Sequence, residues 1–438
     1  MDPEVDRAAA SRPAALTRRR FLRGAAAAGV AASLGGVAAF LAACSPQTSP
    51  SPSSSQGSAM PSSGSPPPAS ASADPSAVEP SPSASATATS SPPPALSLEQ
   101  KIAGLMIVGF RGSRLEQTPW IRTAVADRGL RGVILFDRDQ PTGAQRNVLS
   151  AAQVRRLVAD LRAAAAPRAI VASIDQEGGI VTRLSPTHGF PALASEAEIG
   201  GGTVATARRW ASTMATTLAD AGIDLDYAPV VDLNVNRHSP AIGGLDRSFS
   251  ADPDVVVRMS TIEIEALRRV GVRSTLKHFP GIGSSTTNTD FGVADVTKTW
   301  SRTELEPFRQ LIAAGTADLV MAGHVVNGQL DPDRPASLSK AIVTDLLRGE
   351  LGWDGVVVTD DLQAAAITKR FGRDEAVLLA LEAGNDLLLF ANQQVYDKTI
   401  VERVVGVVAA AVASGRLPEG RIDEAWARVE RRFGATAP

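Results

Sequence analysis

Eight short segments rich in branched apolar residues recur between residues 96 and 438, and longer segments with helical spacing separate them. The candidate strands are residues 102–110, 132–136, 169–175, 225–232, 273–280, 319–325, 355–361 and 386–391. The candidate helices include residues 151–165, 204–221, 253–270, 302–314 and 376–383. Strands that are apolar on both faces and alternate with helices indicate a parallel sheet. Eight such units predict an α/β fold, a (β/α)8 TIM-type barrel in a single catalytic domain.

An open, doubly wound parallel sheet is the structural alternative to the barrel. That fold often binds a dinucleotide through a GxGxxG turn after its first strand. No such turn follows residues 102–110. The barrel is therefore the preferred prediction, and a dinucleotide cofactor is not expected.

Charge and metal-binding residues argue against several other classes of function. The formal net charge is -2, and because charges of both signs are interspersed, neither nucleic acid nor a polyanion is expected as a partner. The single cysteine, Cys44, permits no disulfide framework and no thiolate metal site. The histidines are scattered without the spacing of metal ligands. We expect a monomer that needs neither a metal nor a cofactor.

Residues 1–44 have the pattern of an export signal. Consecutive arginines, Arg18 to Arg20, precede an Ala/Gly-rich run, as in a twin-arginine signal peptide. The run ends in LAAC, which resembles a bacterial lipobox whose last residue, Cys44, is lipidated. An uncleaved transmembrane anchor is the alternative. Both interpretations place the rest of the chain outside the cytoplasmic membrane, and the lipobox predicts a protein that is lipid-anchored to its outer face, in the cell-wall zone.

Residues 45–95 consist largely of Ser, Pro, Ala, Thr and Gly. They contain too few large apolar groups to offset the entropy of ordering, so they predict a disordered tether. Proline keeps such a segment extended, and at about 3 Å per residue it has a maximal reach on the order of 100 Å. That reach suits a substrate in the cell wall.

Polar residues follow several of the candidate strands. In a (β/α)8 barrel, the catalytic residues lie at the C-terminal ends of the strands and in the loops beyond them. The polar residues at these positions are Asp175, Asp232, Lys277, His278, His324, Asp360 and Asp361. We therefore expect a polar site at one end of the barrel.

Asp360, in the segment VVVTDDL, is a candidate nucleophile for the cleavage of a glycosidic bond. Hydrolysis with retention needs one ionised carboxylate to attack the anomeric carbon and one acid to protonate the leaving oxygen. The alternative is that this aspartate caps the N-terminus of the following helix. With Asp361 adjacent, one carboxylate can cap while the other reacts.

The segment LLRGELGWDGVVVTDDL, residues 346–362, resembles the active-site signature of glycoside hydrolase family 3. In that signature the aspartate after Ser or Thr is the nucleophile, which implies Asp360. Gln363 occupies the next position, where the signature has a small residue.

Three further segments resemble sugar-binding motifs of the same family, in the same order. They are IDQEGGIVTR, DRSFSADP and KHFPGIG, and the sugar contacts that they imply are Asp175, Arg183, Arg247, Lys277 and His278. Aspartate accepts hydrogen bonds from two hydroxyls, whereas Arg and Lys donate to sugar oxygens. A purely structural ion-pair network is the alternative for each residue taken singly. The resemblance extends over nearly all of residues 96–438 and implies the β-N-acetylglucosaminidase branch.

The loop after KHFPG departs from that branch, which carries an Asp-x-His pair whose histidine is the general acid/base. Direct register places Asn288 and Asp290 at these two positions. Asp290 is the expected acid/base if its pKa is raised, with Asn288 in support. The alternatives are a plain Asn-Thr-Asp turn, or an acid/base role for Asp295 or His324. An ionised Asp290 would also repel phosphate, so water is the expected acceptor.

The resemblance implies an exo-glycosidase that releases terminal β-linked N-acetylglucosamine, and the export signal points to glycans or muropeptides of the cell wall as its substrates. A β-glucosidase of the same family is one alternative. A non-catalytic, sugar-binding lipoprotein of the cell wall is another, because the usual Asp-x-His pair is missing. Asp360 argues against the binding protein, since binding alone does not require that carboxylate.

Overall fold

The computed structural model describes residues 96–434. The export signal, Cys44 and the tether predicted for residues 1–95 lie outside the described residues, as do residues 435–438. Within residues 96–434, no helix is both long enough and apolar enough to cross a membrane.

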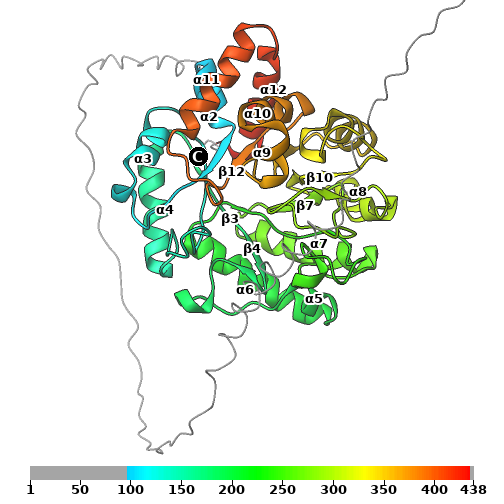
Figure 1. The fold of residues 1–438 in the computed structure, drawn as a ribbon. Helices are drawn as coiled ribbons and strands as arrows, with labels where there is room; N and C mark the ends of the chain where they lie inside the picture. Colours follow the sequence, from blue (N-terminus) through cyan, green and yellow to red (C-terminus); the bar gives the residue numbers. More distant parts are fainter. Residues whose placement is uncertain (1–95, 435–438) are drawn as a thin grey trace, which may run out of the picture. The chain divides into compact units, whose positions relative to one another are not determined.

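Eight parallel strands form the barrel, and Figure 1 shows the helices placed around them. The strands are β1 (Met106–Gly109), β2 (Gly132–Ile134), β3 (Val171–Ile174), β6 (Leu225–Asp226), β7 (Thr275–Phe279), β9 (Leu319–Ala322), β11 (Val356–Thr359) and β12 (Leu388–Phe390). Ladders join them into one sheet in the order β12-β1-β2-β3-β6 and a second in the order β11-β9-β7. Parallel bridges complete the circuit: Leu225 to Arg273, Val230 to Lys277 and Val358 to Leu387. The predicted (β/α)8 barrel is confirmed.

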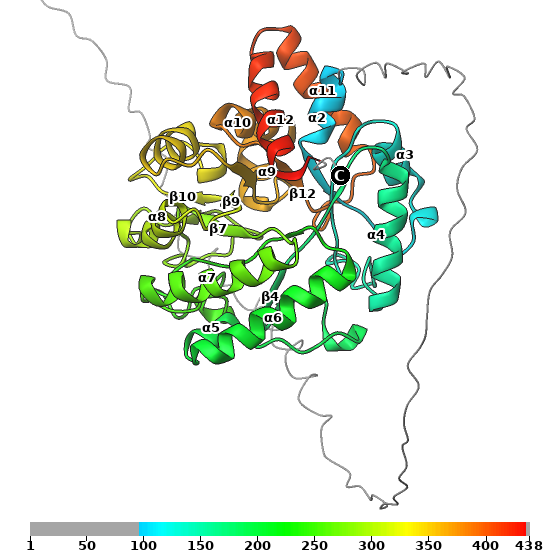
Figure 2. The ribbon, with the colours of Figure 1, turned by 180° about the vertical axis from the view of Figure 1, so that it is seen from behind.

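Helices cover the outside of the barrel, and both Figure 1 and Figure 2 show α6 beside α7. The α-helices are α2 (Leu98–Gly104), α3 (Pro119–Ala126), α4 (Ala151–Ala165), α5 (Glu196–Gly200), α6 (Val204–Ala221), α7 (Pro253–Arg269), α8 (Glu306–Ala313), α9 (Ala365–Phe371), α10 (Arg373–Ala383), α11 (Ile400–Ala413) and α12 (Glu419–Phe433), and η6 (Ala341–Glu350) is a π-helix. Side-chain caps define several starts. Ser150 accepts from the amide of Gln153 at α4, and Asp252 accepts from the amide of Asp254 at α7.

Short elements lie in the loops between the barrel units. The additional strands are β4 (Gln176–Gly178), β5 (Val181–Thr182), β8 (Ala294–Asp295) and β10 (Val325–Val326). The 3-10 turns are η1 (Leu115–Gln117), η2 (Pro186–His188), η3 (Gly243–Leu245), η4 (Arg302–Leu305) and η5 (Ala336–Leu338). β4 and β5 form an antiparallel hairpin directly after β3. Glu177 belongs to this hairpin, and Arg183 follows it directly.

Among the predicted boundaries that differ from the structure, three have a clear local description. Residues 102–104 belong to α2, because Ser97 and Gln100 form a capping box that starts a helix there. The ladder of the fourth strand ends at Asp226, and Pro229, which has no amide hydrogen to donate, follows shortly after. The predicted helix 302–314 begins as the 3-10 turn η4 and continues as α8.

The core lies inside the barrel and between the strands and the helices. Every residue of β7, β9 and β11 is buried, as expected for strands that are covered on both faces. The valines of β11 are at most 1% exposed. The chain therefore leaves this strand at a fixed position, with Asp360 as the first residue beyond it.

Candidate active site

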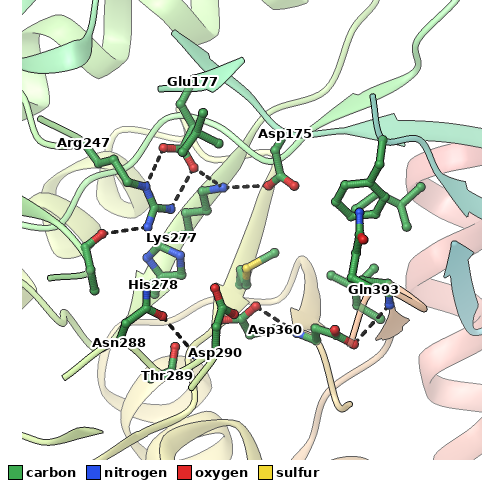
Figure 3. A pocket seen from close by; sticks show the side chains of 18 of the residues that line it. Asp175, Glu177, Arg247, Lys277, His278, Asn288, Thr289, Asp290, Asp360 and Gln393 are labelled. Atoms are coloured by element: carbon green, nitrogen blue, oxygen red, sulfur yellow. Dashed lines mark hydrogen bonds and ion pairs between the residues drawn. The ribbon is translucent and has the colours of Figure 1, made fainter. Parts of the chain in front are cut away.

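A cavity of about 260 Å³ opens at the C-terminal ends of the strands, where the sequence predicts it (Figure 3). Its polar lining comes from segments that are distant in sequence: Gln140, Asp175, Glu177, Arg183, Arg247, Lys277, His278, Asn288, Thr289, Asp290, Asp360, Asp361, Gln393 and Gln394. Ile134, Leu389 and Ala391 contribute apolar surface. Within residues 96–434, no group of three or more His, Cys, Asp or Glu side chains is arranged to hold a metal ion.

Asp360 follows β11 and points into the cavity (Figure 3). Its amide donates to the carbonyl of Ala322 on β9 (3.0 Å), and its Oδ1 accepts from the amide of Asp361 (2.8 Å). Burial raises the pKa of Asp360, but His324, His278 and the Asp361 amide lower it more, so the net pKa lies below its ordinary value. Asp360 is therefore an ionised carboxylate at neutral pH.

Asp361 does not cap the following helix, so the capping role considered for this pair is wrong. The N-cap of α9 is Ala364, which has no side-chain cap. The Oδ1 of Asp361 instead accepts from the amides of Gln363 and Ala391, each at 3.1 Å. Burial raises the pKa of Asp361 to about 7. This side chain ties the turn after β11 to the end of β12 and thereby supports Asp360.

An ion-pair network forms one wall of the cavity. Lys277 Nζ lies 3.0 Å from Asp175 Oδ1 and 2.7 Å from Glu177 Oε1. Arg247 binds the same Glu177 carboxylate through two nitrogens, at 2.7 and 2.8 Å. Arg183 lies 3.6 Å from Asp175 and stacks over the ring of Phe136. The structure thus brings all the predicted cationic sugar contacts to one wall.

Glu177 is a central member of this network that the sequence analysis missed. It is 1% exposed. Burial alone would raise its pKa, but Arg247 and Lys277 lower the pKa well below its ordinary value. The available signal was its position two residues after Asp175, because alternate residues of an extended segment face the same side. The ionised Glu177 holds Lys277 and Arg247 in fixed positions at the cavity.

His278 is oriented by Asp232, which is fully buried. The Nδ1–H of His278 donates to Asp232 Oδ2 (2.7 Å), and the amides of His278 and Ile282 donate to the same carboxylate at 3.0 and 2.8 Å. Asp232 therefore bonds to Nδ1 and not to Nε2 of His278, whose ring lines the cavity. The sequence placed Asp232 at a strand end. Only the structure shows that it is the partner of His278.

Asp290 also lines the cavity, next to Asn288 (Figure 3). The amide of Asp290 donates to Asn288 Oδ1 (2.9 Å), so the predicted Asn-Thr-Asp turn exists and directs Asp290 toward the cavity. Burial raises the pKa of Asp290, and the charge of Asp360 raises it further, against smaller opposing effects of Arg247 and His278. A carboxyl group with a raised pKa therefore shares a cavity with an ionised one.

His324 and Asp295, the other acid/base candidates, are absent from the cavity lining. His324 Nε2 donates to the carbonyl of Asp361 (2.8 Å), and its Nδ1 accepts from Ser337 (2.7 Å). Burial lowers the pKa of His324 below its ordinary value, against the raising effects of the Asp360 charge and the bond to Asp361. The Oδ1 of Asp295 accepts from the amide of Thr297. His324 thus supports the turn that carries Asp360, and Asp290 is the acid/base candidate inside the cavity.

Three glutamines that line the cavity belong to none of the motifs recognised in the sequence. They are Gln140, Gln393 and Gln394. Gln393 accepts from the amide of Gln140 (2.9 Å) and donates to the carbonyl of Arg138 (3.0 Å). Gln394 Nε2 donates to the carbonyl of Asp290 (2.8 Å). These contacts connect the loops after β2, β7 and β12.

Comparison with known proteins identifies relatives for nearly all of the described chain. The model of the glycosyl hydrolase family 3 N terminal domain matches residues 97–432. The beta-hexosaminidase of Xanthomonas euvesicatoria pv. vesicatoria (strain 85-10) is 36% identical over 309 residues, covering 68% of this chain and 86% of the relative. That of Stenotrophomonas maltophilia (strain K279a) is 37% identical with the same coverage.

Solved structures agree with this assignment. A family 3 beta-N-acetylglucosaminidase from Paenibacillus sp. str. FPU-7 is 35% identical with a TM-score of 0.70, and the match covers 78% of this chain and 64% of that one. A beta-N-acetylhexosaminidase from Beutenbergia cavernae DSM 12333 is 32% identical, also with a TM-score of 0.70, and is covered over 99% of its length.

Proposed function

This chain belongs to glycosyl hydrolase family 3, and we propose that it is a retaining exo-β-N-acetylhexosaminidase whose nucleophile is Asp360. One observation carries the mechanism: Asp360 and Asp290 line the same cavity, and their pKa values are shifted in opposite directions. Two carboxyl groups whose environments separate their pKa values are suited to act as nucleophile and acid. Membership of the family supports the glycosidase activity. The roles of Asp360 and Asp290 in the reaction are inferred from the surroundings of these two side chains.

In the first step, a carboxylate oxygen of Asp360 attacks the anomeric carbon and forms a glycosyl ester. The bond from that carbon to the leaving oxygen breaks as Asp290 donates its proton to this oxygen. In the second step, Asp290, now ionised, removes a proton from water, and the oxygen of that water attacks the anomeric carbon. The ester bond breaks, the hemiacetal leaves with retained configuration, and both carboxyl groups return to their first state.

The ion-pair wall supplies the contacts to the sugar. Asp175 accepts hydrogen bonds from hydroxyls, whereas Lys277, Arg183, Arg247 and the ring of His278 face the remaining ring substituents. The cavity volume of about 260 Å³ is near the lower end of the range for ligand sites, which fits one terminal sugar better than an internal segment of a chain. Both features support exo-cleavage of terminal β-linked N-acetylglucosamine.

The proposed natural substrates are peptidoglycan-derived fragments that end in N-acetylglucosamine. Support comes from the sequence of residues 1–95, whose twin-arginine pattern, lipobox Cys44 and Ser/Pro/Ala-rich tether favour a lipid-anchored protein in the cell-wall zone. Labelling cells with a lipid precursor and testing whether Cys44→Ser loses the label checks the anchor. A fully soluble, unlabelled wild-type protein would contradict it.

Turnover of aryl glycosides tests the enzymatic proposal. We expect the aryl β-N-acetylglucosaminide to be cleaved in preference to the aryl β-glucoside, and Asp360→Ala to reduce kcat by at least about 10³-fold, because the covalent step is lost. A slowly reacting fluorinated sugar is expected to label Asp360. Preference for the glucoside would favour the β-glucosidase alternative, and sugar binding without turnover would favour a binding protein.

A further inference from the structure

One hydrogen bond connects two loops that line the cavity, and one of these loops carries Asp290. Gln394, in the loop after β12, donates from Nε2 to the carbonyl oxygen of Asp290 at 2.8 Å. Asp290 lies in the loop after β7, and β9 and β11 separate β7 from β12 around the barrel. The bond therefore joins two loops whose strands are not neighbours.

The loop after β12, which carries Gln394, is anchored by buried hydrogen bonds. Gln363 and Asn392 pair through their polar groups: Gln363 Nε2 donates to Asn392 Oδ1 (3.0 Å), and the amide of Asn392 donates to Gln363 Oε1 (2.7 Å). Asn392 also donates to the carbonyl of Gly109 on β1 (2.9 Å). Gln363 is 3% exposed and Asn392 is fully buried. These buried bonds anchor the loop to the barrel next to Gln394.

The segment 286–293 around Asp290 is, by contrast, held mainly by its own residues. The amides of Asp290, Phe291 and Gly292 all bond to Asn288, at 2.9 to 3.2 Å. Phe291 is 69% exposed. The hydroxyl of the adjacent Ser285 also bonds to Thr287. Among the hydrogen bonds of residues 96–434, the bond from Gln394 is the only one that a side chain distant in sequence makes to this segment. Gln394 therefore provides the side-chain hydrogen bond that connects Asp290 to a distant loop.

We infer that Gln394 is a positioning residue for the acid/base Asp290, and that Gln363 and Asn392 form the platform from which it acts. This inference rests on the proposed function. A general acid acts only within hydrogen-bond reach of the leaving oxygen, so a loop that moves away lowers the rate of the step that needs its proton. One net hydrogen bond corresponds to about a 2- to 10-fold change in such an equilibrium.

The inference also explains Gln363, which departs from the small residue of the family signature. A small side chain there could not form the reciprocal pair with Asn392 or donate to the carbonyl of Val395 (3.1 Å). Asp290 is the second departure, in the place of the usual histidine. Gln394, in the loop that Gln363 helps to anchor, thus connects Gln363 to Asp290.

The test compares full-length wild type with Gln394→Met, Asp290→Ala and the double variant. Methionine is close in size to glutamine but has no amide to donate. The substrates are a dinitrophenyl β-N-acetylglucosaminide, whose leaving group needs little protonation, and N,N′-diacetylchitobiose, whose leaving group needs it. The readout is kcat/KM, which reports the first irreversible step.

We expect Gln394→Met to lower kcat/KM on the disaccharide by about 2- to 10-fold and to leave the dinitrophenyl substrate nearly unchanged. Added to Asp290→Ala, the same change should cause no further loss, because the residue acts through the aspartate. Gln363→Ala should show the same dependence on the leaving group. Gln329→Met is the matched control, since Gln329 donates to the carbonyls of Thr297 and Trp300 and does not line the cavity. It should leave kcat/KM unchanged for both substrates.

Equal losses on both substrates, or an additional loss in the double variant, would overturn the positioning role of Gln394. If Asp290→Ala shows the expected leaving-group dependence and Gln394→Met does not, the inference fails while the proposed function stands. If Asp290→Ala itself reduces both substrates equally, the acid/base assignment fails, and the inference fails with it.

Discussion

Replacing Glu177 by glutamine should destabilise the protein in a manner that depends on pH. Glu177 is 1% exposed and is bonded to both Arg247 and Lys277 at 2.7 to 2.8 Å. Glutamine keeps the volume but removes the charge, which leaves two buried cations with a weaker partner. Breaking a buried pair in this way costs about 3–5 kcal/mol of unfolding free energy. Urea denaturation at pH 7 measures this loss.

The pH dependence follows from the direction of the pKa shift. The pKa of Glu177 lies well below its ordinary value of 4.5 in the folded state, because Arg247 and Lys277 outweigh the effect of burial. Between the two pKa values the unfolded chain binds more protons at this carboxyl, so stability rises with pH. The contribution is complete above the unfolded pKa and declines as pH falls. Between pH 7 and pH 3.5, the stability gap between wild type and variant should therefore shrink by about 1.4 kcal/mol.

Glu350→Gln is the control for this experiment, because Glu350 pairs with Arg302 on the surface and both side chains are more than half exposed. Such exposed pairs contribute about 0–1 kcal/mol. A Glu177→Gln loss as small as that of the control would refute the reasoning. So would a loss that has the same size at pH 7 and at pH 3.5.

Three further predictions concern catalysis. The pH profile of kcat/KM should fall on the acid side, below the ordinary aspartate pKa, as Asp360 is protonated, and on the basic side, above that pKa, as Asp290 loses its proton. With an activated aryl substrate, the Asp290→Ala variant should not show the fall on the basic side. Added phosphate should not accelerate turnover of the aryl substrate, because ionised Asp290 repels it, and accumulation of a sugar phosphate would contradict this role. Asp232→Asn should lower kcat/KM by about 10²-fold, because it weakens the bonds that orient His278, and an unchanged rate would show that this orientation is unimportant.

Much of the fold was predictable because it depends on local patterns. Buried β-branched runs and helical spacing indicated eight units. Seven of the predicted strand segments contain the observed barrel strand and include no helical residue. The first includes residues of α2, because the capping box at Ser97 is a short-range signal that competes with an apolar run. Boundaries of this kind depend on individual hydrogen bonds, which periodicity does not report.

The candidate site was predictable to the extent that its residues stand at strand ends. Asp360, Asp175, Lys277 and His278 were placed there by the strand pattern and by motifs within single segments, and the structure brings them to one cavity. Glu177 was missed because its role depends on ion pairs with two cations, which lie 70 and 100 residues further along the chain. A motif describes one segment and does not report such partners.

The sequence by itself determined the alternation of strands and helices, the carboxylate that follows the seventh strand, and the departure of Asn288 and Asp290 from the usual pair. Only the tertiary structure decided that Asp361 ties two loops together, that Asp232 orients His278, and that Gln394 bonds to Asp290. The physical reason is that closing the barrel brings the ends of all eight strands to one rim. Contacts at that rim depend on the order of strands around the barrel, and no single segment contains that information.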